Sequence, residues 1–346
     1  MSAQTTVPSA EPAAPGEPTG ARRRGGVGRL LSSSAGRNIG LVVALGVLFA
    51  IGAITAGERF TNVENILTII RYASIVGVVS VGMTFVIIGG GIDLSVGSLM
   101  GLGSVVATLT VVQSLAESTS WIVMAIVAIL VGTLAGVVNG IVVSYGNVVA
   151  FMATLAMLVA ARGFAEILSN RTTQIVRSQE LIEFFRANLL GIPVLIWIFL
   201  IVAVAGWLLL NRTTFGRRTV AIGGNREAAR LAGINVKRHI VALYALSGTT
   251  AGIGAVMYLG RTTAGTSTHG TLVELDVIAA VVVGGTLLIG GRGTIVGTVF
   301  GVLIFATLIN VFIQNNLNTS VQAVAKGAII VLAVLLQQRF AARAKR

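Results

Sequence analysis

Asp93 stands in the segment GGGIDLSVGS, residues 89–98, between two long apolar runs. An ionised carboxylate in such surroundings must face a partner or a polar cavity, because placing it in hydrocarbon costs about 2.5–3.5 kcal/mol. Asp93 can also accept amide hydrogen bonds as the N-cap of a helix that starts near Ser95, and both roles are compatible. The preceding glycines permit irregular backbone, which an apolar environment tolerates only where protein or water covers it. We therefore predict a broken helix, held by Asp93, beside a polar path to which four residues contribute: Gly90, Gly91, Asp93 and Ser95.

A second informative stretch is NRTTFGRRTVAIGGNREAARLAGINVKRHI, residues 211–240, which is strongly basic. Asn225 is a good helix N-cap, and Gly233 closes the short alanine-rich run that follows it. Glu227 in the first turn suits the positive end of the helix dipole. The pattern predicts a short helix that forms a compact protrusion between two apolar runs. The alternative is an inert amphipathic connector held by lipid headgroups.

Three further residues are candidates for the polar path. Asn139 lies in a glycine-rich apolar run, where its amide either bonds a neighbouring helix or lines the path. Phe151 offers an aromatic face that a path could use, although a single Phe in an apolar helix is more often packing. Asn310 is the third candidate.

The remaining polar groups inside apolar runs have structural explanations. Arg162 and Glu166 are four residues apart, so they share one helix face and are expected to pair. Glu274 and Asp276 precede an apolar run and suit the N-terminus of its helix. Arg292 in the sequence GGRG is interpreted as a positively charged anchor in a turn.

The composition identifies the environment in which these groups must work. Of the 346 residues, 55% are hydrophobic and only 11% are charged, whereas soluble domains are about a quarter charged. An all-α, polytopic membrane protein fits this composition, since helices of about 20 apolar residues span a bilayer. There is no cysteine, which excludes disulfides and thiolate metal sites, and the two histidines are too few for a metal centre.

The apolar runs divide the chain into about ten candidate spans. They are 38–56, 71–89, 95–112, 121–144, 148–168, 190–210, 239–260, 275–291, 294–313 and 320–338. The net charge of +13 comes from basic clusters that flank these spans, which is typical of a membrane protein rather than of a nucleic-acid-binding protein. Six spans before 211–238 and four after it place both termini and this segment in the cytoplasm. The basic loop 169–189 disagrees, since it would face outward.

Three regions follow from this division. Residues 1–37 hold four of the five prolines and are expected to form a disordered cytoplasmic tail. Residues 38–338 form the transmembrane domain, with 211–238 as its large cytoplasmic loop, and 339–346 form a basic cytoplasmic C-terminus. The motifs GTLAGVVNG (132–140) and GTIVGTVFG (293–301) share one glycine spacing five spans apart. They indicate either a 5+5 inverted repeat or convergence on a shared packing motif.

Several of these motifs resemble one known family. EAARLAG in 227–233 is similar to the Glu-Ala-Ala-x-x-x-Gly loop of ATP-binding-cassette importer permeases, and its surroundings resemble the branch that carries ribose, xylose and arabinose. The segments GGGIDLSVGSLMGLGS, FMATLAML and ELDVIAAVVVGGTLLIGGRGTIVGT resemble further motifs of that branch, in the same order. The resemblance covers about residues 40–338.

The resemblance implies a homodimeric permease in the plasma membrane, driven by cassette ATPase subunits and supplied by an extracytoplasmic sugar-binding protein. It implies that the short helix docks on the ATPase, through Asn225, Glu227, Ala228, Ala229 and Gly233. The chain itself holds no phosphate loop, because none of its three lysines follows a glycine. ATP and Mg²⁺ are therefore expected in the partner, and no cofactor in this chain.

Three alternatives remain. An ion-driven secondary transporter would need deep carboxylates, for which only Asp93 and Glu166 qualify, and it would not explain the short cytoplasmic helix. A branched-chain amino-acid permease would need sites for a carboxylate and an ammonium group, whereas buried charge is scarce. A membrane-embedded enzyme would need a nucleophile, base or metal constellation, and the sequence shows none. The sequence does not identify the sugar.

Overall fold

The computed structural model describes residues 34–344, which confirm the prediction of an all-α membrane protein. Seven helices in this part of the chain are long and apolar enough to cross a bilayer: α2 (Ser34–Ala56), α4 (Val63–Ile88), α7 (Ile122–Ser144), α8 (Ala150–Ser169), α10 (Val194–Arg212), α13 (Val236–Thr262) and α15 (Ile295–Gln314). An eighth span arises if α5 (Val96–Ala107) and α6 (Thr110–Ser118) are counted together, although they are bent by 60°.

The predicted count of ten spans is therefore not confirmed. The run 275–291 holds only α14 (Val273–Val283), whose 11 residues reach about half-way across a bilayer at 1.5 Å per residue. The run 320–338 lies on α16 (Thr319–Ala344), which is not among these seven or eight. The predicted tail is corrected at its end, because α2 already begins at Ser34, and residues 1–33 lie outside the described part.

Short elements connect the long helices. The helices are α3 (Glu58–Thr61), α9 (Gln179–Arg186), α11 (Thr214–Gly224) and α12 (Arg226–Leu231). Two antiparallel pairs of two-residue strands join β1 (Gln174–Ile175) to β4 (Ala264–Gly265) and β2 (Asn188–Leu189) to β3 (Ile192–Pro193). They fasten connecting segments to each other and form no larger sheet.

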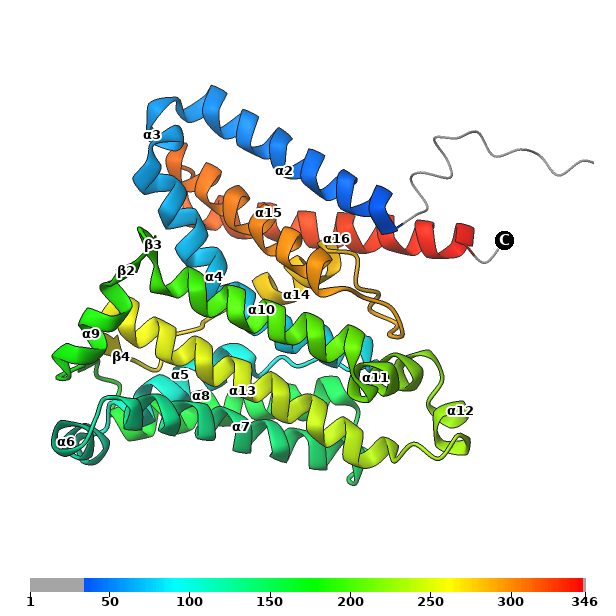
Figure 1. Cartoon of the computed structure of the whole chain (residues 1–346), viewed down its shortest axis with the longest axis horizontal. Coiled ribbons are helices and arrows are strands. Elements are labelled where there is room, and N and C mark those ends of the chain that lie inside the picture. Colours follow the sequence, from blue (N-terminus) through cyan, green and yellow to red (C-terminus); the bar gives the residue numbers. More distant parts are fainter. Residues whose placement is uncertain (1–33, 345–346) are drawn as a thin grey trace, which may run out of the picture.

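The long helices lie roughly side by side in a bundle, with α2, α15 and α16 on one side and α7 and α8 on the other (Figure 1). The start of α2, the segment with α11 and α12, and the end of α16 lie together at one end of the bundle, which we call the basic end (right in Figure 1). The helices α3, α6 and α9 lie at the opposite end. The segment 211–238 and the described start and end of the chain thus lie at one end of the bundle.

The centre of the bundle is α4. Every residue from Ala73 to Ile88 is buried, so this part of the helix is covered on all sides by protein. Its sequence is apolar around the whole circumference, which is typical of a fully enclosed helix. Consequently the break that follows Ile88 lies within the protein rather than in lipid.

Close backbone contacts hold the bundle together along α7 and α13. A Cβ atom added to Gly136 would lie 2.2 Å from the carbonyl oxygen of Tyr244, and one added to Gly132 would lie 2.3 Å from that of Gly248. The matching motif on α15 faces a different partner, since Gly301 lies against Ala280 of α14. Close packing alone thus accounts for both motifs, and the inverted repeat stays a prediction.

Replacing Gly136 by alanine tests this seam. The added methyl group has no room, so α7 and α13 must separate, and we expect a loss of about 1–3 kcal/mol of stability. The measurement is the thermal unfolding midpoint of the detergent-solubilised protein. Gly163→Ala on α8 is the matched control, because nothing lies within 4 Å of its added Cβ. Equal midpoints for the two variants would contradict the proposed seam.

Candidate functional site

The predicted break between α4 and α5 is confirmed. α4 ends at Ile88, Gly90 has a φ of 80°, and α5 begins at Val96. A positive φ favours glycine at this turn. Gly91 also passes close to another helix, because an added Cβ would lie 2.5 Å from the hydroxyl oxygen of Tyr244 on α13. Glycine is therefore needed here for both conformation and space.

Asp93, Ser95 and Asn139 meet in one buried network. Asp93 is fully buried, and its Oδ1 accepts hydrogen bonds from the amide of Ser95 at 3.0 Å and from the Ser95 hydroxyl at 2.6 Å. The side-chain amide of Asn139, on α7, donates to the same hydroxyl at 2.9 Å. The N-cap of α5 is Ser95 rather than Asp93, which corrects the predicted capping role. Asp93 instead fixes the turn that leads into the helix.

Two other helices brace the same segment. The carbonyl oxygen of Ile92 accepts hydrogen bonds from Tyr244 on α13 and Thr154 on α8, each at 3.3 Å. Ser247 also faces the carboxylate of Asp93. Nevertheless, Asp93 Oδ2 and the Ser247 hydroxyl complete no hydrogen bond within the described residues. A buried carboxylate oxygen without a partner calls for an explanation such as a ligand or a water molecule.

A second irregular segment, 263–272, runs beside α5. Gly265 lies against Thr108 near the end of α5, and Gly270 lies against Gly97 in its first turn. Ser104 of α5 donates a hydrogen bond to the carbonyl oxygen of Thr266 at 3.2 Å. The segment therefore follows α5 from the opposite end toward the middle of the bundle, where α14 begins.

The predicted pairing of Arg162 with Glu166 is wrong. Arg162 turns toward the segment 263–272 and donates to the carbonyl oxygens of Ser267 and His269, the latter at 2.9 Å. Glu166 pairs instead with Arg171 of the following turn, with 3.0 Å between Oε2 and Nε. The carbonyl groups of the irregular segment need donors, and Arg162 supplies them.

Glu274 and Asp276 lie in the first turn of α14, as predicted. Both are buried. Asp276 accepts a hydrogen bond from Tyr72 on α4 at 2.9 Å and forms an ion pair with Lys326 on α16 at 3.0 Å. Sequence reasoning missed these partners. Lys326 carried a usable signal, since an ionisable residue inside a predicted span points to a buried partner.

Two predicted path residues lie apart from Asp93. Asn310 exchanges hydrogen bonds with Asn65 on α4 at 2.8 and 3.0 Å, and Gln314 also donates to Asn65 at 2.6 Å. This cluster belongs to the last turns of α15, near the opposite end. Phe151 is 46% exposed in the first turn of α8. The structure thus brings together Asp93, Ser95 and Asn139, but neither Asn310 nor Phe151.

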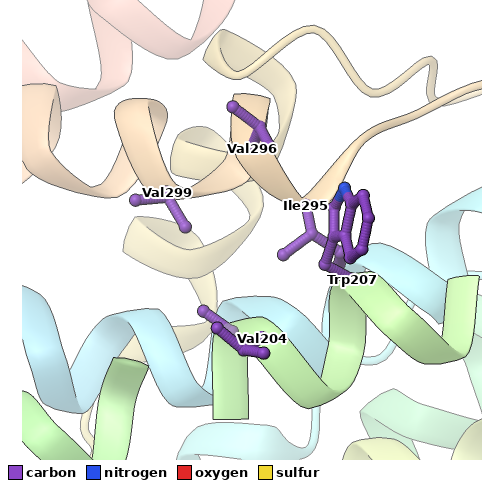
Figure 2. A pocket seen from close by; sticks show the side chains of 6 residues that line it. Val204, Trp207, Ile295, Val296 and Val299 are labelled. Carbon is purple, nitrogen blue, oxygen red and sulfur yellow. The ribbon is translucent and has the colours of Figure 1, made fainter. Parts of the chain in front are cut away.

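Two hollows differ in chemistry. One, of about 260 Å³, lies between α10 and α15. Val204, Trp207 and Val299 line it mostly with carbon atoms (Figure 2). Such a surface suits a hydrocarbon chain and offers little to a hydroxylated molecule. The other, of about 330 Å³, lies beside the α5–α6 bend and is lined largely by polar side chains, among them Thr108, Gln113 and Arg177.

The predicted short helix is confirmed as α12, which protrudes from the basic end (Figure 1). Asn225 caps it by accepting a hydrogen bond from the amide of Ala228 at 3.0 Å, and Gly233 follows its end with a φ of 79°. Glu227 pairs with Arg230, whose hydrogen bond and charge lower the pKa of the Glu227 carboxyl. Leu231 is 79% exposed. The helix thus presents a fixed ion pair and an uncovered apolar side chain.

α11 anchors this protrusion and was not predicted. Its Phe215 lies between Phe85 of α4 and His239 of α13, with ring centroids 6.0 and 4.5 Å apart. The Thr219 hydroxyl hydrogen-bonds His239 Nε2 at 2.8 Å. Thr213 caps the helix, and its position before the run was a signal that could have revealed α11.

Interrupted helices around a buried polar network are typical of membrane transport proteins, and the comparisons with known proteins place this chain among the permeases. The chain belongs to the family described as "Branched-chain amino acid transport system / permease component", whose model matches residues 65–334.

Curated relatives cover nearly the whole chain. The ribose import permease protein RbsC of Escherichia coli (strain K12) is 38% identical over 303 residues, which is 86% of this chain and 92% of the relative. The L-arabinose ABC transporter permease protein AraH of Azospirillum brasilense is 35% identical over 340 residues, 98% of this chain and 96% of the relative. The galactose/methyl galactoside import permease protein MglC of Haemophilus influenzae is 32% identical over 314 residues, 86% and 91%. No solved structure matches.

Asp93 offers a test of the buried network. Asp93→Ala removes the acceptor for the Ser95 amide and hydroxyl, so we expect a loss of about 1–3 kcal/mol of stability. Asp93→Asn keeps one acceptor oxygen and adds a donor facing Ser247, so its thermal unfolding midpoint is expected to stay near that of the parent protein. If the two variants lost equal stability, the negative charge rather than the hydrogen bonds would hold the break.

Proposed function

We propose that this chain is the membrane-spanning permease subunit of an ATP-binding-cassette importer that carries a monosaccharide. The observation that carries the proposal is α12, a capped and exposed helix on an anchored segment of a permease. The names of the similar ribose, arabinose and galactose permeases favour a sugar as cargo.

The proposed orientation places the basic end in the cytoplasm of a cell with this importer in its plasma membrane. Basic residues concentrate on the cytoplasmic side of membrane proteins, and the start of α2, the segment 211–238 and the end of α16 share that end. Both termini are then cytoplasmic. The polar hollow beside the α5–α6 bend faces outward, where an extracytoplasmic sugar-binding protein would deliver the cargo.

α12 is the proposed docking helix for a cassette ATPase. Asn225 and Gly233 define its ends, Glu227 and Arg230 form a preformed ion pair, and Leu231 supplies the exposed apolar contact. Ala228 is exposed and small enough for close contact with a partner, whereas Ala229 is buried and holds the helix against the rest of the chain. Because Arg230 lowers the pKa of Glu227, the carboxylate stays charged throughout the neutral range. ATP and Mg²⁺ bind the partner and not this chain.

The cargo path is proposed to pass the α4–α5 break. Gly90 and Gly91 bring the backbone close, Ser95 and Asn139 hold the turn, and Asp93 Oδ2 is free to accept a hydrogen bond from a hydroxyl group. Phe151 and Asn310 remain weaker candidates because neither joins this network. A second copy of the chain would complete the path, with lipid around the pair.

The charges of the described core favour a sugar over an amino acid. An amino acid would need one positive and one negative group free to bind it. Asp93 Oδ2 and Glu274 Oε2 have no hydrogen-bond partner among the described residues, but Arg162 is occupied by two carbonyl oxygens and Lys326 by Asp276. Neither of these two cations is therefore free for the carboxylate of an amino acid. A neutral sugar needs only hydrogen-bonding groups. An ion-driven transporter would leave the anchored α12 without a role.

Glu227→Lys tests the docking helix. The substitution replaces the ion pair with two like charges while leaving the Asn225 cap intact, so we expect the permease to insert normally but to lose the ATPase and all uptake. The measurements are co-purification of the ATPase and uptake of labelled sugar by cells. Glu58→Lys is the matched control, since Glu58 is an exposed glutamate on α3 at the opposite end. Normal uptake by the Glu227→Lys variant would contradict the docking assignment.

A further inference from the structure

Three backbone segments meet at the basic end without side chains between them. The amide of Gly291 donates to the carbonyl oxygen of Ile88 at 2.8 Å. A Cβ atom added to Gly223 would lie 1.7 Å from that same oxygen and 2.6 Å from the Gly291 nitrogen. One added to Gly290 would lie 2.9 Å from the Gly223 oxygen and 3.0 Å from the Cα of Gly90. We call these five residues, Ile88, Gly90, Gly223, Gly290 and Gly291, the glycine junction.

Each segment of the junction belongs to a different part of the permease. Ile88 and Gly90 begin the break that leads to Asp93. Gly223 lies in the last turn of α11, two residues before the N-cap of α12. Gly290 and Gly291 lie in the turn between α14 and α15, and both have positive φ, 88° and 76°. The junction therefore joins the protruding segment to two interrupted regions, the α4–α5 break and the turn between α14 and α15.

We propose that the glycine junction is the relay through which α11 and α12 move the α4–α5 break and the α14–α15 turn together. The proposal rests on the proposed function, in which an ATPase acts on α12, and it names the residues that pass the displacement on. Gly223 is thus a positioning residue for transport rather than a residue that touches the cargo.

The contacts suit a relay because they are made by backbone atoms alone. A side chain could absorb a displacement by changing rotamer, whereas backbone atoms in direct contact transmit it. α11 is held at its start by Phe215 between Phe85 and His239, and at its end by Gly223. A force applied to α12 would therefore act on α11, which contacts the rest of the chain at both of its ends.

The glycine junction lies close to the buried network of Asp93. Gly91 rests on Tyr244, whose hydroxyl donates to the carbonyl oxygen of Ile92, the residue before Asp93. On the other side, Gly293 packs on Thr286 and Ile88. Movement at the junction would thus reach both Asp93 and the turn before α15.

Gly223→Ala is the first test, with the neighbouring Gly224→Ala as its matched control. Gly224 has nothing within 4 Å of an added Cβ and no positive φ, so alanine is accommodated there. In the full complex with ATPase and binding protein, we expect Gly223→Ala to retain the ATPase and ATP hydrolysis but to lower sugar uptake about tenfold or more. Gly224→Ala should behave as the parent protein.

The outcomes separate the relay from the proposed function. Failure of the parent complex to capture an ATPase or to take up sugar would refute the proposed function itself. Normal uptake by Gly223→Ala with an intact parent complex would refute only the relay. If Gly223→Ala does not fold, the second test decides.

The second test uses the absence of cysteine from the chain. Gly224→Cys and Arg292→Cys place two thiols on exposed positions beside the junction, where a Cβ on Gly291 would lie 3.0 Å from the Cα of Gly224. A short bis-maleimide should link them equally well in the nucleotide-free and ATP-trapped complex, and the linked protein should keep its uptake. Loss of linking in one state, or loss of uptake on linking, means that the segments separate and overturns the relay.

Discussion

Inside a membrane every backbone amide and carbonyl group must find its partner within the protein, and this constraint determines where the polar side chains of this permease lie. Helices satisfy it by themselves, but the interrupted segments do not. Tyr244 and Thr154 therefore bond Ile92, Arg162 bonds the segment 263–272, and Gly291 bonds Ile88. Asp93, which the sequence marks by its charge, likewise accepts a hydrogen bond from the amide of Ser95 at the break.

Glycine contributes to the packing of the helices in a different way. Where two backbones approach without side chains, as between α7 and α13 or at the glycine junction, they form contacts that are both tight and specific. This explains why a chain with 43 glycines can remain well packed. It also explains how a short segment outside the bundle can be connected firmly to segments inside it, since backbone contact leaves little room for independent motion.

The features that could be predicted from the sequence are those encoded locally. Apolar length revealed the seven long helices, and Asn225 with Gly233 revealed α12, because caps act within one turn. The half-length α14 could not be recognised, since its apolar run continues through Gly284 and Gly285, where the chain turns. Ser267 lies 105 residues from Arg162, and the partners of Asp276 lie 50 and 204 residues away. Spacing along one helix therefore predicted the wrong pair for Arg162 and no partner for Asp276. The sequence predicted that Asp93 supports the break, but its hydrogen bonds with Ser95 could be identified only from the structure.

On the proposed account, this permease receives work from an ATPase at α12 and passes it inward through backbone contacts. The most direct measurement of that claim is sugar uptake by liposomes that contain the purified chain, with or without a cassette ATPase and binding protein. Uptake should require the ATPase, together with ATP on the side of the membrane where α12 lies. A proton or sodium gradient alone should drive no uptake. Uptake by the chain alone, powered by an ion gradient, would contradict the account.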